Sequence, residues 1–186
     1  MNYTDGARGR ESDCQRILAF YRGEGRDDRG RTFEEVLDFD DEELEETHDY
    51  IQWLFPLAVP SGVQPWAPLV DRECQERFRA DPELGNALRR ALERMLEFYG
   101  LRIVPKGGDV AIQRSENFAR RAEVWLTQGN HNFLRLTRMM ASLSLLGQQE
   151  VAAALQTCLK DIYRDFGETI GVRTLGYWSN AIASTR

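Results

Sequence analysis

The chain contains two histidines, His48 and His131, and these are the side chains best suited to acid–base chemistry. An imidazole changes its charge near neutral pH, so either ring could move a proton in a hydrolase-like reaction, with Asp49 as the carboxylate. A histidine in such a position is more often a hydrogen-bonded core or capping residue. Catalysis by His48 or His131 with Asp49 is therefore the alternative interpretation, and a binding protein is the leading one.

A polar stripe begins at His131 in a segment that is otherwise apolar. Its members stand at i, i+4, i+7 and i+11, the spacing of one helix face, and are His131, Arg135, Arg138 and Ser142. Such a stripe can face solvent, form an internal ion-pair seam, or line a pocket for an anion or a peptide carboxylate. We expect Arg135 and Arg138 to be partly buried and at least one of them to pair with a carboxylate of residues 40–49.

The predicted ligand is a peptide or a small anion, held between a helix at 44–55 and a helix at 131–146. The side chains expected to contact it are His48, Trp53, Asn130, His131, Asn132, Arg135 and Arg138. We expect no metal and no cofactor, because two histidines without paired cysteines do not make a zinc site and no Gly-rich phosphate loop or nucleophile motif occurs. The three cysteines lie far apart in sequence and are expected to be reduced and buried.

Composition narrows the class of protein. The chain has 186 residues, 42% of them apolar, which suits one domain, and we place it at residues 12–186 after a disordered segment at 1–11. A net charge of −6 argues against nucleic acid as a partner. No apolar run approaches the roughly 18 residues of a membrane span, and the first residues lack a secretory signal, so we expect a cytoplasmic protein. The sequence does not indicate an oligomeric state.

Three apolar helices are expected to form the core. The aromatic stretch His48–Pro60 should end a helix over 44–55, a stripe from Leu84 should form a helix over 84–99, and a helix over 131–146 is apolar nearly all round and should be central and buried. Trp53 and Phe55 should then be among the least exposed residues.

The remaining elements are predicted from caps, stripes and turns. Helices are expected over 14–21 after Ser12, over 151–166 up to Gly167 and over 172–182. Residues 101–112 read as two strands around a Gly-Gly turn, and the proline-rich segment, residues 58–69, should run extended over the core with Trp66 as its anchor. The predicted fold is an all-α, irregular bundle of about seven helices around a buried central helix, with one small β-hairpin at most.

Several long motifs resemble a known family. They are HDYIQWLFPL at 48–57, the Pro-Ser step at 60–61, MLEFYGL at 95–101, ENF at 116–118 and HNFLRLTRMMASL at 131–143. Together they resemble the opioid growth factor receptor conserved domain over roughly residues 12–182. The resemblance implies a receptor-like, ligand-binding domain. In animals this domain is named for binding Met-enkephalin, and its proteins are linked to the nucleus and to membranes.

Overall fold

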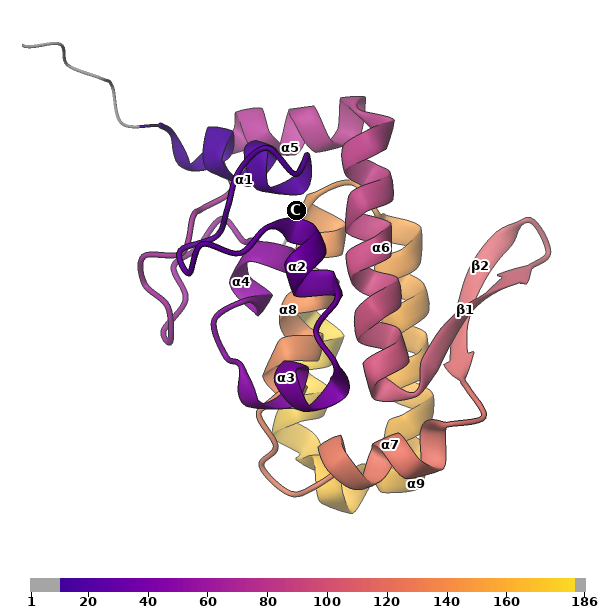
Figure 1. Ribbon diagram of the computed structural model, residues 1–186. Coiled ribbons are helices and arrows are strands. Elements are labelled where there is room, and N and C mark those ends of the chain that lie inside the picture. Colours follow the sequence, from indigo (N-terminus) through magenta and orange to yellow (C-terminus); the bar gives the residue numbers. More distant parts are fainter. Residues whose placement is uncertain (1–10, 183–186) are drawn as a thin grey trace, which may run out of the picture.

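The computed structural model describes residues 11–182 as a bundle of helices with one projecting hairpin (Figure 1). The helices are α1 (Asp13–Tyr21), α2 (Phe33–Leu37), α3 (Asp41–Glu46), α4 (Ile51–Leu54), α5 (Arg72–Ala80), α6 (Pro82–Tyr99), α7 (Phe118–Trp125), α8 (Asn132–Leu145) and α9 (Gln149–Asn180), and the strands are β1 (Leu101–Lys106) and β2 (Asp109–Arg114). The predicted all-α class with one hairpin is confirmed. The described residues form nine helices rather than about seven. Of the segment predicted to be disordered, residues 1–10 lie outside the described part of the chain.

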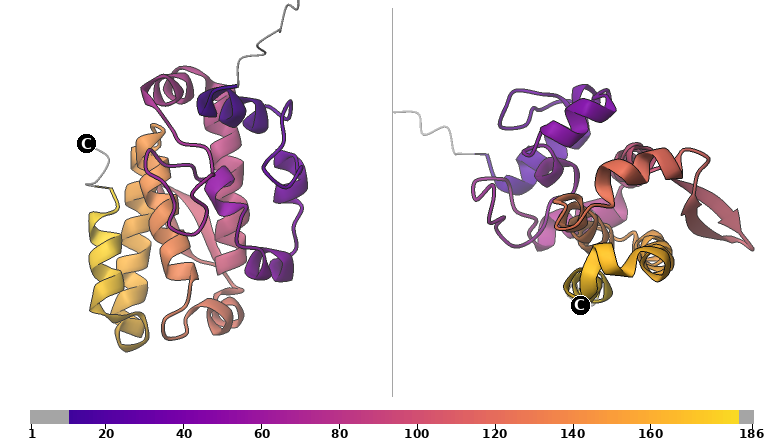
Figure 2. Two further views of the ribbon diagram at one scale, coloured as in Figure 1. Left: turned by 90° about the vertical axis from the view of Figure 1, so that its left-hand side faces the viewer. Right: turned by 90° about the horizontal axis from the view of Figure 1, so that it is seen from below.

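Helix α8 lies at the centre, between the N-terminal segment and α9 (Figure 2). Most of its residues are buried, including Phe133, Leu136 and Met139, as its apolar circumference predicts. One continuous core joins it to α6 and to the segment containing Trp53 and Phe55, which are 1% and 0% exposed. The predicted joining of these three segments in one core, with the helix of residues 131–146 buried at its centre, is therefore confirmed.

Local sequence signals fix several helix ends. Ser12 accepts a hydrogen bond from the Gln15 backbone N–H at the start of α1, and the Gln15 side chain accepts one from the Ser12 backbone. Gly100 ends α6 with a φ of 71°, and a Cβ there would lie 2.7 Å from the Phe118 Cα. Both the conformation and the close approach therefore require glycine.

Helix α9 is two helices joined by a bend, as predicted, with the bend at Phe166–Gly171 instead of at Gly167 alone. Phe166 and Gly171 have non-helical backbone angles. The second half folds back along the first, where Gln156 Nε2 donates to the Trp178 carbonyl at 2.8 Å. The glycine with a positive φ of 78° is Gly171.

The helix predicted over 44–55 is wrong as one continuous element. It divides into α3 and α4, and residues 47–50 between them are not helical. The Leu44 carbonyl accepts from Arg135 Nη1 at 2.7 Å and from the Tyr50 hydroxyl at 3.0 Å, and the Thr47 carbonyl accepts from Arg135 Nη2 at 2.7 Å. The Arg135 and Tyr50 side chains thus donate to carbonyls that would accept backbone hydrogen bonds in a continuous helix.

The proline-rich segment leaves and rejoins the core as an exposed loop. The Val70 backbone N–H donates to the Leu57 carbonyl at 2.9 Å, which closes its base. Trp66 is 71% exposed, so its predicted role as an anchor is wrong. Within residues 11–182 no helix has the length and apolarity needed to cross a lipid bilayer.

Candidate ligand-binding site

A groove of about 490 Å³ separates α4 and the proline-rich segment from the outer face of α8, the location predicted for a ligand. It brings together four of the predicted residues, His48, His131, Arg135 and Arg138, with an apolar wall. The full lining is His48, Ile51, Gln52, Leu57, Val59, Pro60, Ser61, Gly62, Val63, His131, Leu134, Arg135, Thr137, Arg138 and Ala141. None of these side chains is acidic, although the chain carries a net charge of −6.

The two histidines lie side by side in this lining. Their ring centroids are 4.8 Å apart and the planes are tilted by 45°. His48 Nδ1 lies 2.6 Å from the Glu46 carbonyl, and because a carbonyl only accepts, that nitrogen carries the proton. The pKa of His131 is lowered, chiefly because burial disfavours the charged ring and also because Arg135 is close, while Glu45 raises it. The lowered pKa favours the neutral ring of His131.

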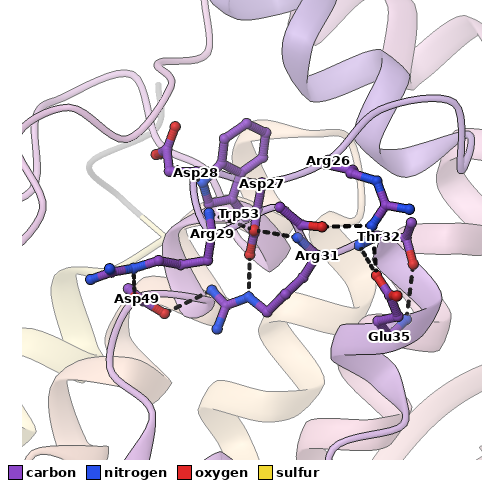
Figure 3. A network of polar contacts seen from close by, with 10 residues as sticks. Arg26, Asp27, Asp28, Arg29, Arg31, Thr32, Glu35, Asp49 and Trp53 are labelled. Atoms are coloured by element: carbon purple, nitrogen blue, oxygen red, sulfur yellow. Dashed lines mark hydrogen bonds and ion pairs between the residues drawn. The ribbon is translucent and has the colours of Figure 1, made fainter.

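The Asp49 side chain lies in an arginine network (Figure 3). Its two oxygens accept from Arg31 Nη2 at 2.7 Å and from Arg29 Nε at 2.6 Å. Burial raises the pKa of Asp49, but the bonds from Arg31 and Arg29 outweigh this and hold the pKa below its usual value. The predicted pairing of Asp49 with a histidine is wrong, since its oxygens are already bonded. The carboxylate nearest to His131 is Glu45, 3.6 Å from Nε2.

Arg135 is buried and saturated by backbone groups. It is 5% exposed, and besides the Leu44 and Thr47 carbonyls it donates to Asn132 Oδ1 at 3.2 Å. It forms no ion pair with residues 40–49, so the predicted partner is corrected from a carboxylate to the carbonyls at the end of α3. Carbonyls at a helix C-terminus lack a partner within the helix and attract a cation, which explains why Arg135 bonds to them.

Two acidic side chains of residues 40–49 pair with arginines outside α8. Asp41 pairs with Arg94 at 3.1 Å and with Arg121 at 3.0 Å, on α6 and α7. Asp49 pairs with Arg29 and Arg31 in the loop before α2. None of these arginines comes from α8.

Arg138 differs from Arg135 because most of its hydrogen-bonding capacity is unused. Its Nη1 donates to the Phe55 carbonyl at 3.2 Å. Within residues 11–182 it forms no ion pair, and burial lowers its pKa to about 10. The Nε and Nη2 atoms have no partner in this part of the chain and are not enclosed, so they are open to the groove. The predicted partial burial of Arg138 is confirmed, and its predicted carboxylate partner is absent among residues 40–49.

The other three residues predicted to contact a ligand form hydrogen bonds within the protein. The Trp53 indole N–H donates to Asp28 Oδ2 at 3.2 Å, Asn132 accepts from the Tyr99 hydroxyl at 3.1 Å, and Asn130 Oδ1 accepts from the Asn132 backbone N–H at 2.9 Å. None of the three lines the groove.

Sequence reasoning missed Gln52 and part of the α8 face. Gln52 is 5% exposed, and its Oε1 has no hydrogen-bond partner in the described residues. On α8, Leu134, Thr137 and Ala141 join Arg138 at i, i+3, i+4 and i+7, a spacing that could have found this face. Nothing in the sequence indicates which residues of the proline-rich segment form the opposite wall. In the described part of the chain no three or more histidine, cysteine or carboxylate side chains are arranged to hold a metal ion.

Comparison with known proteins finds similarity over nearly the whole chain. The family model for the opioid growth factor receptor (OGFr) conserved region matches residues 12–186. The opioid growth factor receptor of Homo sapiens is 39% identical over 152 residues, which are 78% of this chain and 22% of that protein. Opioid growth factor receptor-like protein 1 of Mus musculus is 37% identical over 129 residues, 68% of this chain and 27% of that protein. The chain thus matches about a quarter or less of these relatives' lengths, and no solved structure matches it.

Proposed function

The chain belongs to the family of the opioid growth factor receptor conserved region, and on that premise we propose that it is a binding domain whose groove holds a peptide or a small anionic ligand. The observation that carries the proposal is the Arg138 guanidinium, which lies in the groove without an anionic partner from the described residues. A partly buried cation without a counter-charge is unfavourable, and an incoming anion would relieve this.

The lowered pKa of Arg138 supports the same proposal. Burial alone accounts for it, and no nearby carboxylate opposes the shift. A ligand carboxylate at the guanidinium would supply the missing charge through charge-assisted hydrogen bonds. The apolar wall formed by Ile51, Leu57 and Leu134 favours a ligand that also carries an apolar body.

The relatives' name adds a candidate ligand class. Three of them are called opioid growth factor receptor, in Homo sapiens, Rattus norvegicus and Mus musculus. A receptor-like, peptide-binding role for this chain agrees with the groove. Because the chain spans a small part of those proteins, the proposal concerns the groove alone.

A hydrolase-like reaction is the second candidate, and the pairing of the histidine rings at 4.8 Å favours it. His48 Nε2 is the nitrogen left to accept a proton, because Nδ1 donates to Glu46. Turnover of p-nitrophenyl acetate that is lost in both His48→Gln and His131→Gln would favour this function. Equal background turnover in all three proteins would argue against it.

The binding function is tested by titrating the ¹⁵N-labelled protein with hexanoate, an apolar chain with one carboxylate, and following amide chemical shifts. We expect saturable shifts at groove residues, and we expect Arg138→Met to abolish them. The matched control is Arg72→Met, which removes the same charge from a side chain that is 92% exposed and outside the groove. The proposal fails if neither hexanoate nor a peptide acid causes a saturable shift, or if the hexanoate shifts survive in Arg138→Met.

A further inference from the structure

We propose that the anion bound in the groove is the free C-terminal carboxylate of a peptide whose last residues are apolar. This inference rests on the proposed binding function and names the ligand class. Three features of the groove carry it: the free edge of one guanidinium, an unpartnered side-chain amide, and an exposed apolar rim.

The free edge of Arg138 fits a carboxylate. Its Nη1 is engaged by the Phe55 carbonyl, which leaves Nε and Nη2. These two atoms donate in parallel and match the two oxygens of one carboxylate. Arg135, the other arginine of the groove, is already bonded to carbonyls and to Asn132. A single available guanidinium suits a monoanion better than a phosphate, which carries more charge and more acceptors.

The amide of Gln52 fits a peptide group. Neither of its polar atoms has a hydrogen-bond partner in the described residues, and the side chain is almost fully buried on the groove wall. The Oε1 position is enclosed and the Nε2 position is not, and because an amide flip exchanges the two atoms, the accessible position can offer either an N–H donor or an acceptor. A peptide unit presents the complementary pair, whereas a fatty acid or inorganic anion has no N–H to give.

The rim of the groove fits apolar side chains. Val59 and Val63 on the proline-rich segment and Leu134 on α8 are exposed, and all three line the groove from its two sides. Exposed apolar side chains that converge on one groove are typical of a binding surface. An apolar C-terminal residue could cover them while its carboxylate meets Arg138.

The test uses N-acetylated tetrapeptides with Leu, Ile, Val, Phe or Met at the last position, each made as a free acid and as a C-terminal amide. Affinity selection on the full chain followed by mass spectrometry finds the retained peptides, and calorimetry measures each acid and amide pair. We expect the acids to bind about 10- to 100-fold more tightly than their amides. Arg138→Met should remove that difference and Arg72→Met should keep it.

A second variant tests the peptide-group contact. Gln52→Met keeps the size of the side chain and removes both polar atoms, so we expect it to weaken acids and amides by the same factor. Loss of affinity for the acid alone would contradict that role. Circular dichroism of each variant shows whether it is folded before its affinity is compared.

The outcomes separate this inference from the proposed function. If acids and amides bind equally, or if no tetrapeptide binds while hexanoate still shifts groove amides, the C-terminal inference is wrong and groove binding stands. If hexanoate binds as tightly as the best peptide acid, the ligand is a simple organic anion and the peptide class is wrong. If neither hexanoate nor any peptide binds, the proposed function itself fails.

Discussion

At the scale of single residues, the two arginines of α8 show how position changes the energetics of the same side chain. Arg135 donates to the Leu44 and Thr47 carbonyls and so has a structural role. Arg138, one turn later, has one carbonyl partner and an open edge. A buried cation that is fully bonded stabilises the fold, and one that is partly bonded is available to a ligand.

We predict that Arg138→Met leaves the free energy of unfolding unchanged or raises it. The substitution removes a partly buried charge, whose pKa burial lowers to about 10, and keeps an unbranched apolar side chain in its place. Urea denaturation of the ligand-free protein measures the effect. A clear loss of stability would mean that Arg138 supports the fold more than the groove.

His131 should make stability depend on pH. Its folded pKa lies below the ordinary 6.5 because burial and Arg135 disfavour the charged ring. The unfolded chain therefore takes up this proton at a higher pH than the folded chain, so stability is full above pH 6.5 and falls as the pH drops towards the folded pKa. We expect the urea midpoint of His131→Gln to fall less than that of the wild type between about pH 7 and pH 5. Parallel curves would contradict this.

At the scale of elements, the break between α3 and α4 shapes the groove. It carries the Thr47 carbonyl that accepts from Arg135, and His48, within the break, lines the groove. Glu45, near the end of α3, accepts from Asn132 Nδ2 at 2.9 Å and so ties the same segment to the start of α8. One buried arginine therefore couples the position of the α3–α4 segment to that of α8.

We predict that Arg135→Met destabilises the protein by about 3 kcal/mol, because buried carbonyls lose charged donors. Arg138→Met is the matched control on the same helix. Urea denaturation measures both variants, and hydrogen exchange should show faster opening at residues 44–54 in Arg135→Met alone. Equal stability of the two variants would remove the distinction between the two arginines.

At the scale of the whole molecule, one core joins the N-terminal segment to α6, α8 and α9. Trp53 is at a junction in it, because its ring packs against Phe20 at 5.2 Å between centroids and its N–H reaches Asp28. We predict that Trp53→Ala costs about 3–5 kcal/mol, the usual loss for a large core aromatic. A denaturation midpoint close to that of the wild type would show that this part of the core packs independently.

The groove also leads to a prediction about the affinity of the chain for an opioid peptide. Met-enkephalin ends in an apolar residue with a free carboxylate, so we expect binding no tighter than that of other apolar peptide acids, because no groove feature selects its Tyr-Gly-Gly start. Calorimetry against a pentapeptide with the same last two residues and a scrambled start provides the comparison. A nanomolar dissociation constant for Met-enkephalin alone would overturn this prediction.

Local signals in the sequence determined most of the elements of this protein. The Ser12 cap and the stop at Gly100 act through neighbouring backbone groups, and the apolar stripe of α8 requires burial wherever the helix lies. These effects depend on residues close in the chain, so they could be predicted without the fold.

Tertiary structure alone decided the partners and the groove. Ten acidic residues lie between Glu34 and Asp49, and the sequence does not show which of them pair with a distant arginine, because long side chains find their partners only when the helices pack. For the same reason the sequence does not show that Arg135 bonds to carbonyls where the 44–55 helix is interrupted. The proline-rich segment has no periodic pattern, so only packing determined that Trp66 points outward and that the segment forms a wall of the groove beside Arg138.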